Sequence, residues 1–463
     1  MRSMMPVRFW VVWLSALGFI LGSSALASAQ TAGETGAGLT STLTVTPGQR
    51  GGIKIAVVPF AWESAAPPPS QEQDVARVIR SNFNRSGKFE ALREDRYGEL
   101  PTTAADVNFG FWKLAKQEYV VVGRVTDNPD GTFRISYELL KTANEKRLLG
   151  FAEIGRPGDL RRVAHRIADT IYEQILGVRG AFDTQVAYVT STGVGRDITY
   201  RLWVAHSDGF NPIAIAKNNE PFLSPAWSPD GKRLAYVSFE RLANRSEPGR
   251  SSIIVQELAS GVRKAYSSFR GINGAPAFSP DGTRLAMTLS RTGNPEITVM
   301  DFASGKLTQL TRHYAIDTEP QWSPDGQQLF FTSDRGGKPQ IYRMAATGGD
   351  PVRISFQGEY NARVSVGFDG NLLAMVQGNG NVYRIAALDR SRGDPGTTTI
   401  ITDGRLDESP SLAPNASMVL YAAREGTRGV LYAAAVDGTR LKQRLASSEG
   451  DVREPAWGPF RPR

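Results

Sequence analysis

The sequence contains no cysteine among its 463 residues and only three histidines. The absence of cysteine excludes disulfide bonds and thiolate metal sites, so the fold must be stabilised by burial alone. The chain also lacks a Gly-x-Ser-x-Gly elbow, a phosphate-binding Walker loop and a His-Glu-x-x-His motif. We therefore predict no catalytic residue and no metal site, and expect His165, His206 and His313 to be structural or solvated.

Long apolar runs are also absent beyond the first 29 residues. There, Arg2 and Arg8 form a basic region before an apolar segment from Phe9 to Leu21, and Ala27-Ser28-Ala29 resembles a cleavage site. This segment of about 13 residues is shorter than the roughly 20 needed to cross a bilayer. We interpret residues 1–29 as a secretory signal peptide cleaved after Ala29, with an uncleaved anchor as the alternative.

The net charge of +8 comes from scattered arginines and lysines, with no basic run interleaved with aromatic residues. This pattern argues against nucleic-acid binding and favours a solvated basic surface. We expect the mature protein to be an exported monomer without a membrane span.

Two segments precede the second half of the chain. Residues 30–50 are rich in Gly, Thr and Ser and predict a flexible arm, in which the alternation from Leu39 to Val45 could form a strand. Residues 51–178 predict a mixed α/β domain that ends with a helix over 159–176 stopped by Gly177. The other expected elements are strands near 53–60, 119–125, 133–140 and 146–153, a helix with Ser70 as its N-cap, and a helix near 107–116.

A repeat dominates residues 182–463. An apolar residue followed by Ser-Pro-Asp-Gly begins at Trp227, Phe278 and Trp322, and weaker copies follow, so that the motif recurs every 44 to 51 residues. Pro-Asp-Gly favours a tight turn between two strands, and six such units predict a six-bladed β-propeller. The aromatic residues at the repeated position are expected to pack between blades.

The two ends of the repeat region indicate how the ring closes. Residues 185–216 contain three expected strands without a motif-bearing strand, whereas residues 454–458 supply that strand with nothing after it. We therefore predict that the C-terminal strand completes the first blade.

Carboxylates precede several motif strands, where the connecting loops of a propeller open onto one mouth of the central channel. They are Asp317 and Glu319, then Asp407 and Glu408, and finally Asp451 and Glu454. Solvated turn residues are one interpretation; a site for a polar protein loop, a sugar or a cation such as Ca²⁺ is the other. No other cofactor is expected.

The order of domains, the export signal and the repeats resemble the TolB family of the Tol–Pal envelope system. The resemblance covers the whole mature chain and is carried by residues 55–60, 85–89, 273–282 and 407–415. It implies a non-enzymatic periplasmic adaptor in envelope integrity and cell division, which binds the outer-membrane lipoprotein Pal and the inner-membrane protein TolA. A peptidase accessory domain is an alternative, because oligopeptidases have similar repeats, but the chain holds no hydrolase domain.

The resemblance also implies where the partners bind. Thr318 and Glu319 match the Thr-Glu-Pro motif with which family members bind Pal at the channel mouth, and Ile272 stands where some members have a contacting histidine. The segment used for TolA falls in residues 30–50. The candidate residues are Ile272, Asn273, Asp317, Thr318, Glu319, Asp407, Glu408 and Glu454 at the mouth, and Leu39, Thr42, Leu43 and Val45 in the arm.

Overall fold

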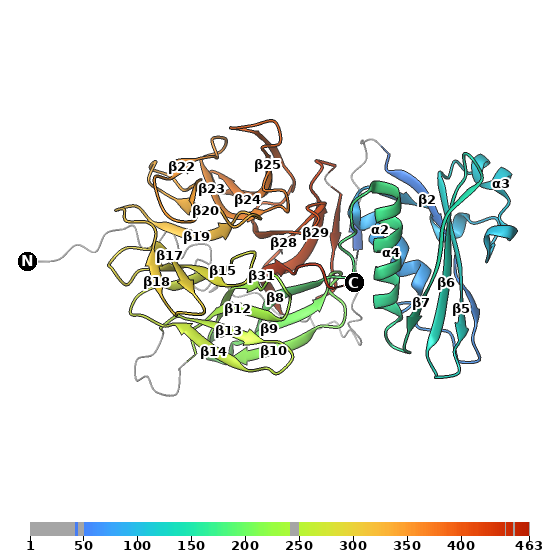
Figure 1. Cartoon of the computed structure of the whole chain (residues 1–463), viewed down its shortest axis with the longest axis horizontal. Coiled ribbons are helices and arrows are strands. Elements are labelled where there is room, and N and C mark those ends of the chain that lie inside the picture. Colours follow the sequence, from blue (N-terminus) through green and yellow to red (C-terminus); the bar gives the residue numbers. More distant parts are fainter. Residues whose placement is uncertain (1–41, 45–50, 241–249, 440, 448–449, 463) are drawn as a thin grey trace, which may run out of the picture. The chain divides into compact units, whose positions relative to one another are not determined.

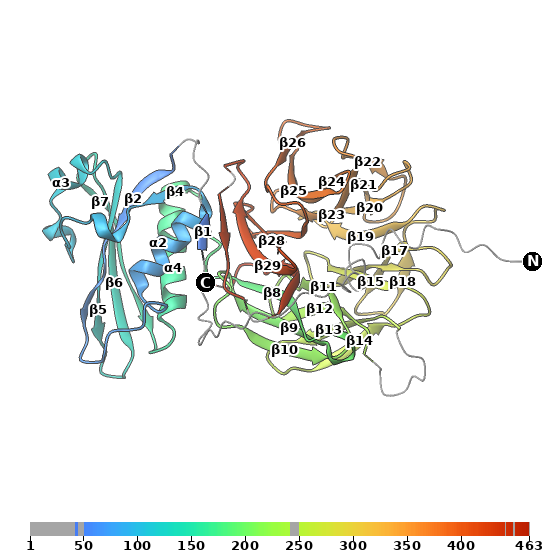
Figure 2. The same cartoon turned by 180° about the vertical axis from the view of Figure 1, so that it is seen from behind.

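A mixed sheet with two long helices against one face forms the first domain (Figure 2). The structure is a computed structural model that describes residues 42–44, 51–240, 250–439, 441–447 and 450–462. Within these residues, no helix is long and apolar enough to cross a membrane.

The sheet has the strand order β4-β2-β5-β6-β7, and β3 also pairs with β5. Strands β2, β4 and β5 are parallel, whereas β5, β6 and β7 are antiparallel. The strands are β2 (Ile53–Val57), β3 (Ala61–Glu63), β4 (Phe89–Ala91), β5 (Tyr119–Asp127), β6 (Phe133–Lys141) and β7 (Lys146–Gly155).

Apolar side chains that alternate along these strands pack into a hydrophobic core on each face of the sheet. Val121 on β5 packs with α2 (Val75–Ser86) and α4 (Leu160–Leu176), while Val120 and Val122 pack with Trp112 of α3 (Phe109–Leu114). Side chains that alternate along a strand point to opposite faces, so one strand serves two cores. Short 3₁₀ helices complete the elements outside the sheets: η1 (Glu94–Arg96), η2 (Ala104–Asp106) and η3 (Gly195–Asp197).

The helix ends agree only in part with the expectations. Helix α4 ends at Gly177 with φ 74°, as predicted. Ser70, however, is not the N-cap of α2, because that helix begins later and Asp74 accepts a hydrogen bond of 2.7 Å from the backbone N–H of Arg77. An Asp carboxylate is at least as good an acceptor for the free N–H groups of a first turn as a Ser hydroxyl.

Six antiparallel sheets then form the predicted propeller (Figure 1). Four of them are β11 (Phe222–Trp227) to β14 (Arg263–Ser267), β15 (Asn273–Phe278) to β18 (Leu307–Gln309), β19 (Asp317–Trp322) to β22 (Val352–Arg353), and β23 (Tyr360–Val366) to β26 (Thr397–Ile400). Their middle strands are β12 (Arg233–Ser238), β13 (Ser252–Glu257), β16 (Arg284–Leu289), β17 (Glu296–Asp301), β20 (Gln328–Ser333), β21 (Gln340–Ala345), β24 (Leu372–Asn379) and β25 (Val382–Asp389).

The fifth sheet receives a strand from the arm. It contains β27 (Asp407–Leu412), β28 (Met418–Glu425), β29 (Arg428–Ala435) and β30 (Lys442–Arg444), and β1 (Thr42–Thr44) pairs antiparallel with β30. The backbone of Thr42 and Leu43 therefore extends a blade, whereas Leu39 and Val45 lie outside the described residues.

The sixth sheet confirms the predicted closure. Its order is β10-β9-β8-β31, in which the C-terminal strand β31 (Asp451–Trp457) pairs with β8 (Gln185–Thr192). The other two strands are β9 (Thr199–His206) and β10 (Ile213–Asn218). Because the two ends of the repeat share one sheet, the ring leaves no inner strand unpaired at its seam.

Two repeated contacts join neighbouring blades. The glycine of each Ser-Pro-Asp-Gly turn has positive φ, and the position of a Cβ on Gly282 would lie 3.3 Å from the ring of Pro229 in the preceding blade. The indole N–H of Trp322 donates to the carbonyl of Ala277, again in the preceding blade, at 3.0 Å. The repeated tryptophans thus pack between blades, as predicted.

Candidate functional site

Every inner strand of the propeller contains a β-bulge, and the residue three positions before the aromatic position adopts a left-handed conformation. The φ values of these six non-glycine residues lie between 46° and 57°. A bulge redirects side chains that strand alternation would send elsewhere, and six bulges at one level make this a feature of the whole ring. The six residues are Ser224, Ala275, Glu319, Arg363, Ser409 and Glu454.

These six residues also line one cavity of about 340 Å³ in the middle of the propeller. The other lining residues follow them along each inner strand toward the Ser-Pro turns, including Trp227 and Pro229 of one blade. The six bulge residues therefore lie at one end of the cavity, and the Ser-Pro turns lie toward the other end.

Arg363 connects the carboxylates of this level. Its guanidinium donates through Nη1 to Oε1 of Glu454 at 2.8 Å and through Nη2 to the other oxygen. Its backbone N–H donates to Oε2 of Glu319 at 3.0 Å, and the same oxygen accepts from the hydroxyl of Thr332 at 2.9 Å. The backbone N–H of Ser224 donates to Oε2 of Glu454 at 2.9 Å. Inner strands β11, β19, β23 and β31 thus share one polar network.

Burial and ion pairing shift the pKa values of the charged groups in and beside this network. Burial alone would lower the pKa of Arg363, but the Glu454 and Glu319 carboxylates more than offset it and raise that pKa. Burial raises the pKa of Glu319, whereas Arg363 overcomes burial at Glu454 and holds its pKa below the usual value. Burial and the nearby Glu454 charge raise the pKa of Glu408 to about 7. Arg363 already provides part of the positive charge that a cation such as Ca²⁺ would bring to these carboxylates.

Three of the predicted mouth residues lie at the first positions of inner strands and are buried within the blade. Asp317 is fully buried and accepts two hydrogen bonds from Nη2 of Arg335, at 2.8 and 3.0 Å. Asn273 is also fully buried and both accepts from and donates to the backbone of Phe269. Asp407 is 2% exposed. Contact of these side chains with a partner stays a prediction, and it would require them to leave their present positions.

The remaining mouth residues are more accessible or lie deeper in the channel. Ile272 is half-buried in the loop before β15, and its backbone N–H donates to Ser290 at 2.7 Å. Thr318 is 7% exposed, with its hydroxyl 3.2 Å from that of Thr288. The side chain of Glu319 retains 22% exposure and is the most accessible carboxylate of the network around Arg363.

Arg363 was not among the predicted mouth residues, because the fourth copy of the motif has Val366 at the aromatic position and lacks the proline that follows two residues later in the other five copies. A usable signal was nevertheless present. Arg363 stands three residues before Val366, which is the position that Glu319 and Glu454 occupy in their own repeats. Aligning all six copies on this position would have brought the arginine together with both carboxylates.

A six-bladed propeller closed by its own C-terminal strand, with a polar network across its channel and an α/β domain before it, defines a class of two-domain β-propeller proteins. Two family profiles match the chain: the TolB amino-terminal domain over residues 41–148 and the TolB beta propeller domain over residues 172–461. The chain belongs to the TolB family.

Individual relatives agree with this assignment. The chain is 54% identical over 98% of its length to "Tol-Pal system protein TolB" of Xanthomonas campestris pv. campestris strain B100, of which it covers 99%. It is also 54% identical to the protein of the same name from Xanthomonas oryzae pv. oryzae strain KACC10331 / KXO85, over 97% of this chain and 98% of that one. The crystal structure of TolB from Acinetobacter baumannii superposes with a TM-score of 0.79 at 37% identity, covering 91% of this chain and all of that one.

The family assignment confirms the resemblance and the two-domain fold that were predicted from the sequence. It also confirms that the chain is not an enzyme; this conclusion rests on the family and not on any absence in the structure.

Proposed function

We propose that the chain is a periplasmic adaptor of the Tol–Pal system in envelope integrity and cell division, with Pal bound at the channel mouth and TolA bound by the N-terminal arm. Its support is the near full-length similarity to proteins named for the Tol–Pal system. The mature protein would start at Gln30 after removal of the signal peptide, which N-terminal mass analysis of the exported protein tests.

Glu319 is the single residue that best supports the mouth as the Pal site. It is the accessible carboxylate of the channel network, and its backbone is held by the bulge and by the hydroxyl of Thr288 at 3.2 Å. A fixed carboxylate in a partly dehydrated channel favours a partner loop that presents N–H groups or a cationic side chain.

The test is binding of the purified mature protein to immobilised Pal. The variant Glu319→Arg places a cation beside Arg363 and should weaken binding by at least tenfold. The matched control is Glu257→Arg, an equal charge change at an exposed position on β13. Unchanged Pal affinity in a correctly folded Glu319→Arg protein would remove the mouth as the site.

The arm is tested separately, by deleting residues 30–45. We expect this deletion to abolish TolA binding and to change Pal affinity by less than threefold, because β1 adds to the outer edge of a blade and not to the channel. Retained TolA binding would show that another surface engages TolA, and would leave the Pal site unaffected.

A further inference from the structure

Buried charged and polar side chains lie where the helices of the α/β domain pack against the propeller. Arg161 and His165 come from α4, Asn82 and Arg85 from α2, and His206 and Asp208 from the end of β9 and its following turn. Five of these side chains are almost inaccessible to solvent, with exposed fractions of 1% for His165 and Asn82, 2% for Arg85, 4% for Asp208 and 6% for Arg161, whereas His206 is half-buried.

Asp208 is the centre of the cluster. Its Oδ2 accepts from Nε and Nη2 of Arg161 at 2.9 and 2.6 Å, and its Oδ1 accepts from the backbone N–H of Phe210 at 3.2 Å. Arg85 donates to the carbonyl and the hydroxyl of Ser207, at 3.0 and 3.1 Å. Both helices are thus tied to one turn of the propeller.

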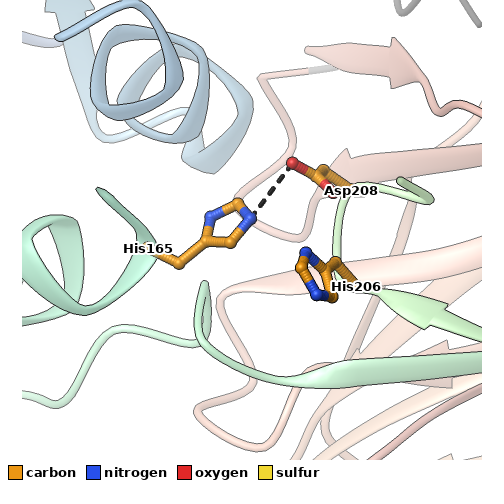
Figure 3. A group of neighbouring side chains, drawn as sticks. All are labelled: His165, His206 and Asp208. Carbon is orange, nitrogen blue, oxygen red and sulfur yellow. Dashed lines mark ion pairs between the residues drawn. The ribbon is translucent and has the colours of Figure 1, made fainter. Parts of the chain in front are cut away.

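The hydrogen bond between Asn82 and His165 fixes the tautomer of the imidazole. Nη2 of Arg85 donates to Oδ1 of Asn82 at 3.2 Å, so Nδ2 of Asn82 must be the atom that donates to Nδ1 of His165 at 2.9 Å. The proton of the neutral imidazole therefore sits on Nε2, which lies 3.2 Å from Oδ2 of Asp208 (Figure 3) but is not aligned for a hydrogen bond with any described residue. A second proton on this ring would point its Nδ1–H at a donor.

His206 has even less capacity to accept a proton. Its ring centroid lies 5.8 Å from that of His165, and its buried Nδ1 has no hydrogen-bond partner among the described residues. Asp208, the carboxylate that acts on His206, is already engaged by Arg161. That engagement also opposes a metal ion, although His165, His206 and Asp208 lie close enough together for their ligand atoms to be within 4.8 Å of one another.

The charges facing the two imidazoles are predominantly positive. Arg85 reaches them from α2, Arg161 from α4 and Arg461 from the C-terminal segment, whereas Asp208 is the carboxylate in direct contact. Two further acids lie at the margin: Asp169 of α4, and Asp183 of the segment that enters the propeller. Protonation of either histidine adds a positive charge for which none of the described side chains of the cluster offers a free acceptor.

We propose that this cluster is an acid-sensitive latch, closed when His165 and His206 are neutral and opened by their protonation, which releases the α/β domain from the propeller.

The direction of the pKa values agrees with this geometry. Burial lowers the pKa of His165, and burial together with the charge of His165 lowers that of His206 to about 4. Because each imidazole has a lower pKa in the closed latch than when free, the closed form is fully stable above the free pKa of about 6.5. This stability is lost as the pH falls toward 4. Asp208, whose pKa His165 and Arg161 hold well below the usual value despite burial, stays charged throughout this range.

Asp169 acts in the opposite direction and must be separated from the histidines. Burial raises its pKa to about 7 while it accepts from the backbone N–H groups of Phe182 and Asp183. An acid with a raised pKa stabilises the closed form as the pH falls, so the histidine effect is isolated only by replacing the histidines.

The experiment is hydrogen exchange of the complete mature protein at pH 7 and pH 5, corrected for the intrinsic rate. The ratio of exchange at pH 5 to exchange at pH 7 in α4 and in the turn after β9 should be roughly 20-fold higher in the unaltered protein than in the double variant His165→Gln/His206→Gln. This figure counts His206 alone, given its shift from 6.5 to about 4, and the opposing effect of Asp169 is common to both proteins. Strands β20 and β21, which are far from the latch in the ring, serve as the internal reference. The variant His313→Gln, which replaces the third histidine of the chain, should keep the ratio of the unaltered protein.

Two outcomes would overturn the proposal. One is an equal ratio of exchange at pH 5 to exchange at pH 7 in the double variant and in the unaltered protein. The other needs no variant at a buried position: if the imidazole NMR signals that remain in His313→Gln titrate at or above pH 6.5, the closed latch does not exclude protons.

Discussion

Arg363 and Glu454 form a two-pronged ion pair between inner strands that do not belong to neighbouring blades. Arg363 lies on β23 and Glu454 on the closing strand β31, and β27 lies between them in the ring. Their side chains are 16% and 4% exposed. The pair therefore holds the channel together across a blade, close to the seam at which the two ends of the propeller meet.

Replacing Arg363 by alanine should lower the free energy of unfolding of the propeller by about 3–5 kcal/mol, because Glu454 would remain buried without its partner. Arg343→Ala is the matched control, since its partner Asp394 is 49% exposed and such pairs contribute about 0–1 kcal/mol. Urea unfolding at pH 7.5 measures both. A loss below 1 kcal/mol for Arg363→Ala would mean that the channel carboxylates find water or other donors.

Glu408 should make the free energy of unfolding of the propeller depend on pH. With its pKa raised to about 7 by burial and by Glu454, the folded protein keeps a proton that the unfolded chain loses above about pH 4.5. The stabilisation that protonated Glu408 contributes to the folded protein is therefore lost as the pH rises from about 4.5 through 7. The variant Glu408→Gln, which stays neutral, should be more stable than the unaltered protein by on the order of 2 kcal/mol at pH 8 and nearly equal to it at pH 4.5. Urea unfolding of both proteins at these two pH values would contradict the assignment if the difference stayed constant.

Two substitutions distinguish the candidate N-caps of α2, Asp74 and Ser70. Asp74→Ala should destabilise the α/β domain by about 1 kcal/mol, because Asp74 accepts the N–H of Arg77 in the first turn. Ser70→Ala should change the free energy of unfolding by less than about 0.5 kcal/mol, as expected for a surface residue outside the helix. Thermal unfolding of the two variants decides between them, and a larger loss at Ser70 would restore the cap predicted from the sequence.

Local patterns predicted the elements well but not their exact ends. The interval between the repeated aromatic residues predicted six blades, because each blade is one repeated unit with its own turn. Ser70 was favoured because it precedes Gln73 by three residues, but the segment between Ser70 and Asp74 forms turns before the helix begins. A capping motif cannot indicate which of two nearby acceptors the chain uses.

The functional groups were harder to predict because they depend on residues distant in the sequence. Simple alternation places Asp317 and Glu319 on one face of a strand, yet the bulge between Thr318 and Gln321 separates their surroundings. Asp317 is then buried against Arg335, while Glu319 lies in the channel. The pairing of Arg161 with Asp208 joins residues 47 positions apart and in different domains. No pattern within either segment indicates that contact.

Trp457 should be the most sensitive residue of the closing strand. Its indole N–H donates to the hydroxyl of Thr184 at 2.8 Å, its backbone N–H donates to Ser411 at 2.8 Å, and its ring belongs to the core shared by the α/β helices and the propeller. Trp457→Ala should lower the free energy of unfolding by about 3–5 kcal/mol, because the truncation leaves a cavity at the seam of the ring. Trp457→Phe keeps most of the ring and should cost about 1–3 kcal/mol.

Phe368→Ala is the control for this experiment, since Phe368 is an aromatic residue of the fourth motif that is 59% exposed. Urea unfolding gives the free energies, and hydrogen exchange of the β8 amides shows whether the seam opens first. If Trp457→Ala lowers stability while β8 stays as protected as β20, the tryptophan stabilises the shared core without controlling closure, because an opened seam would expose the edge that β31 covers.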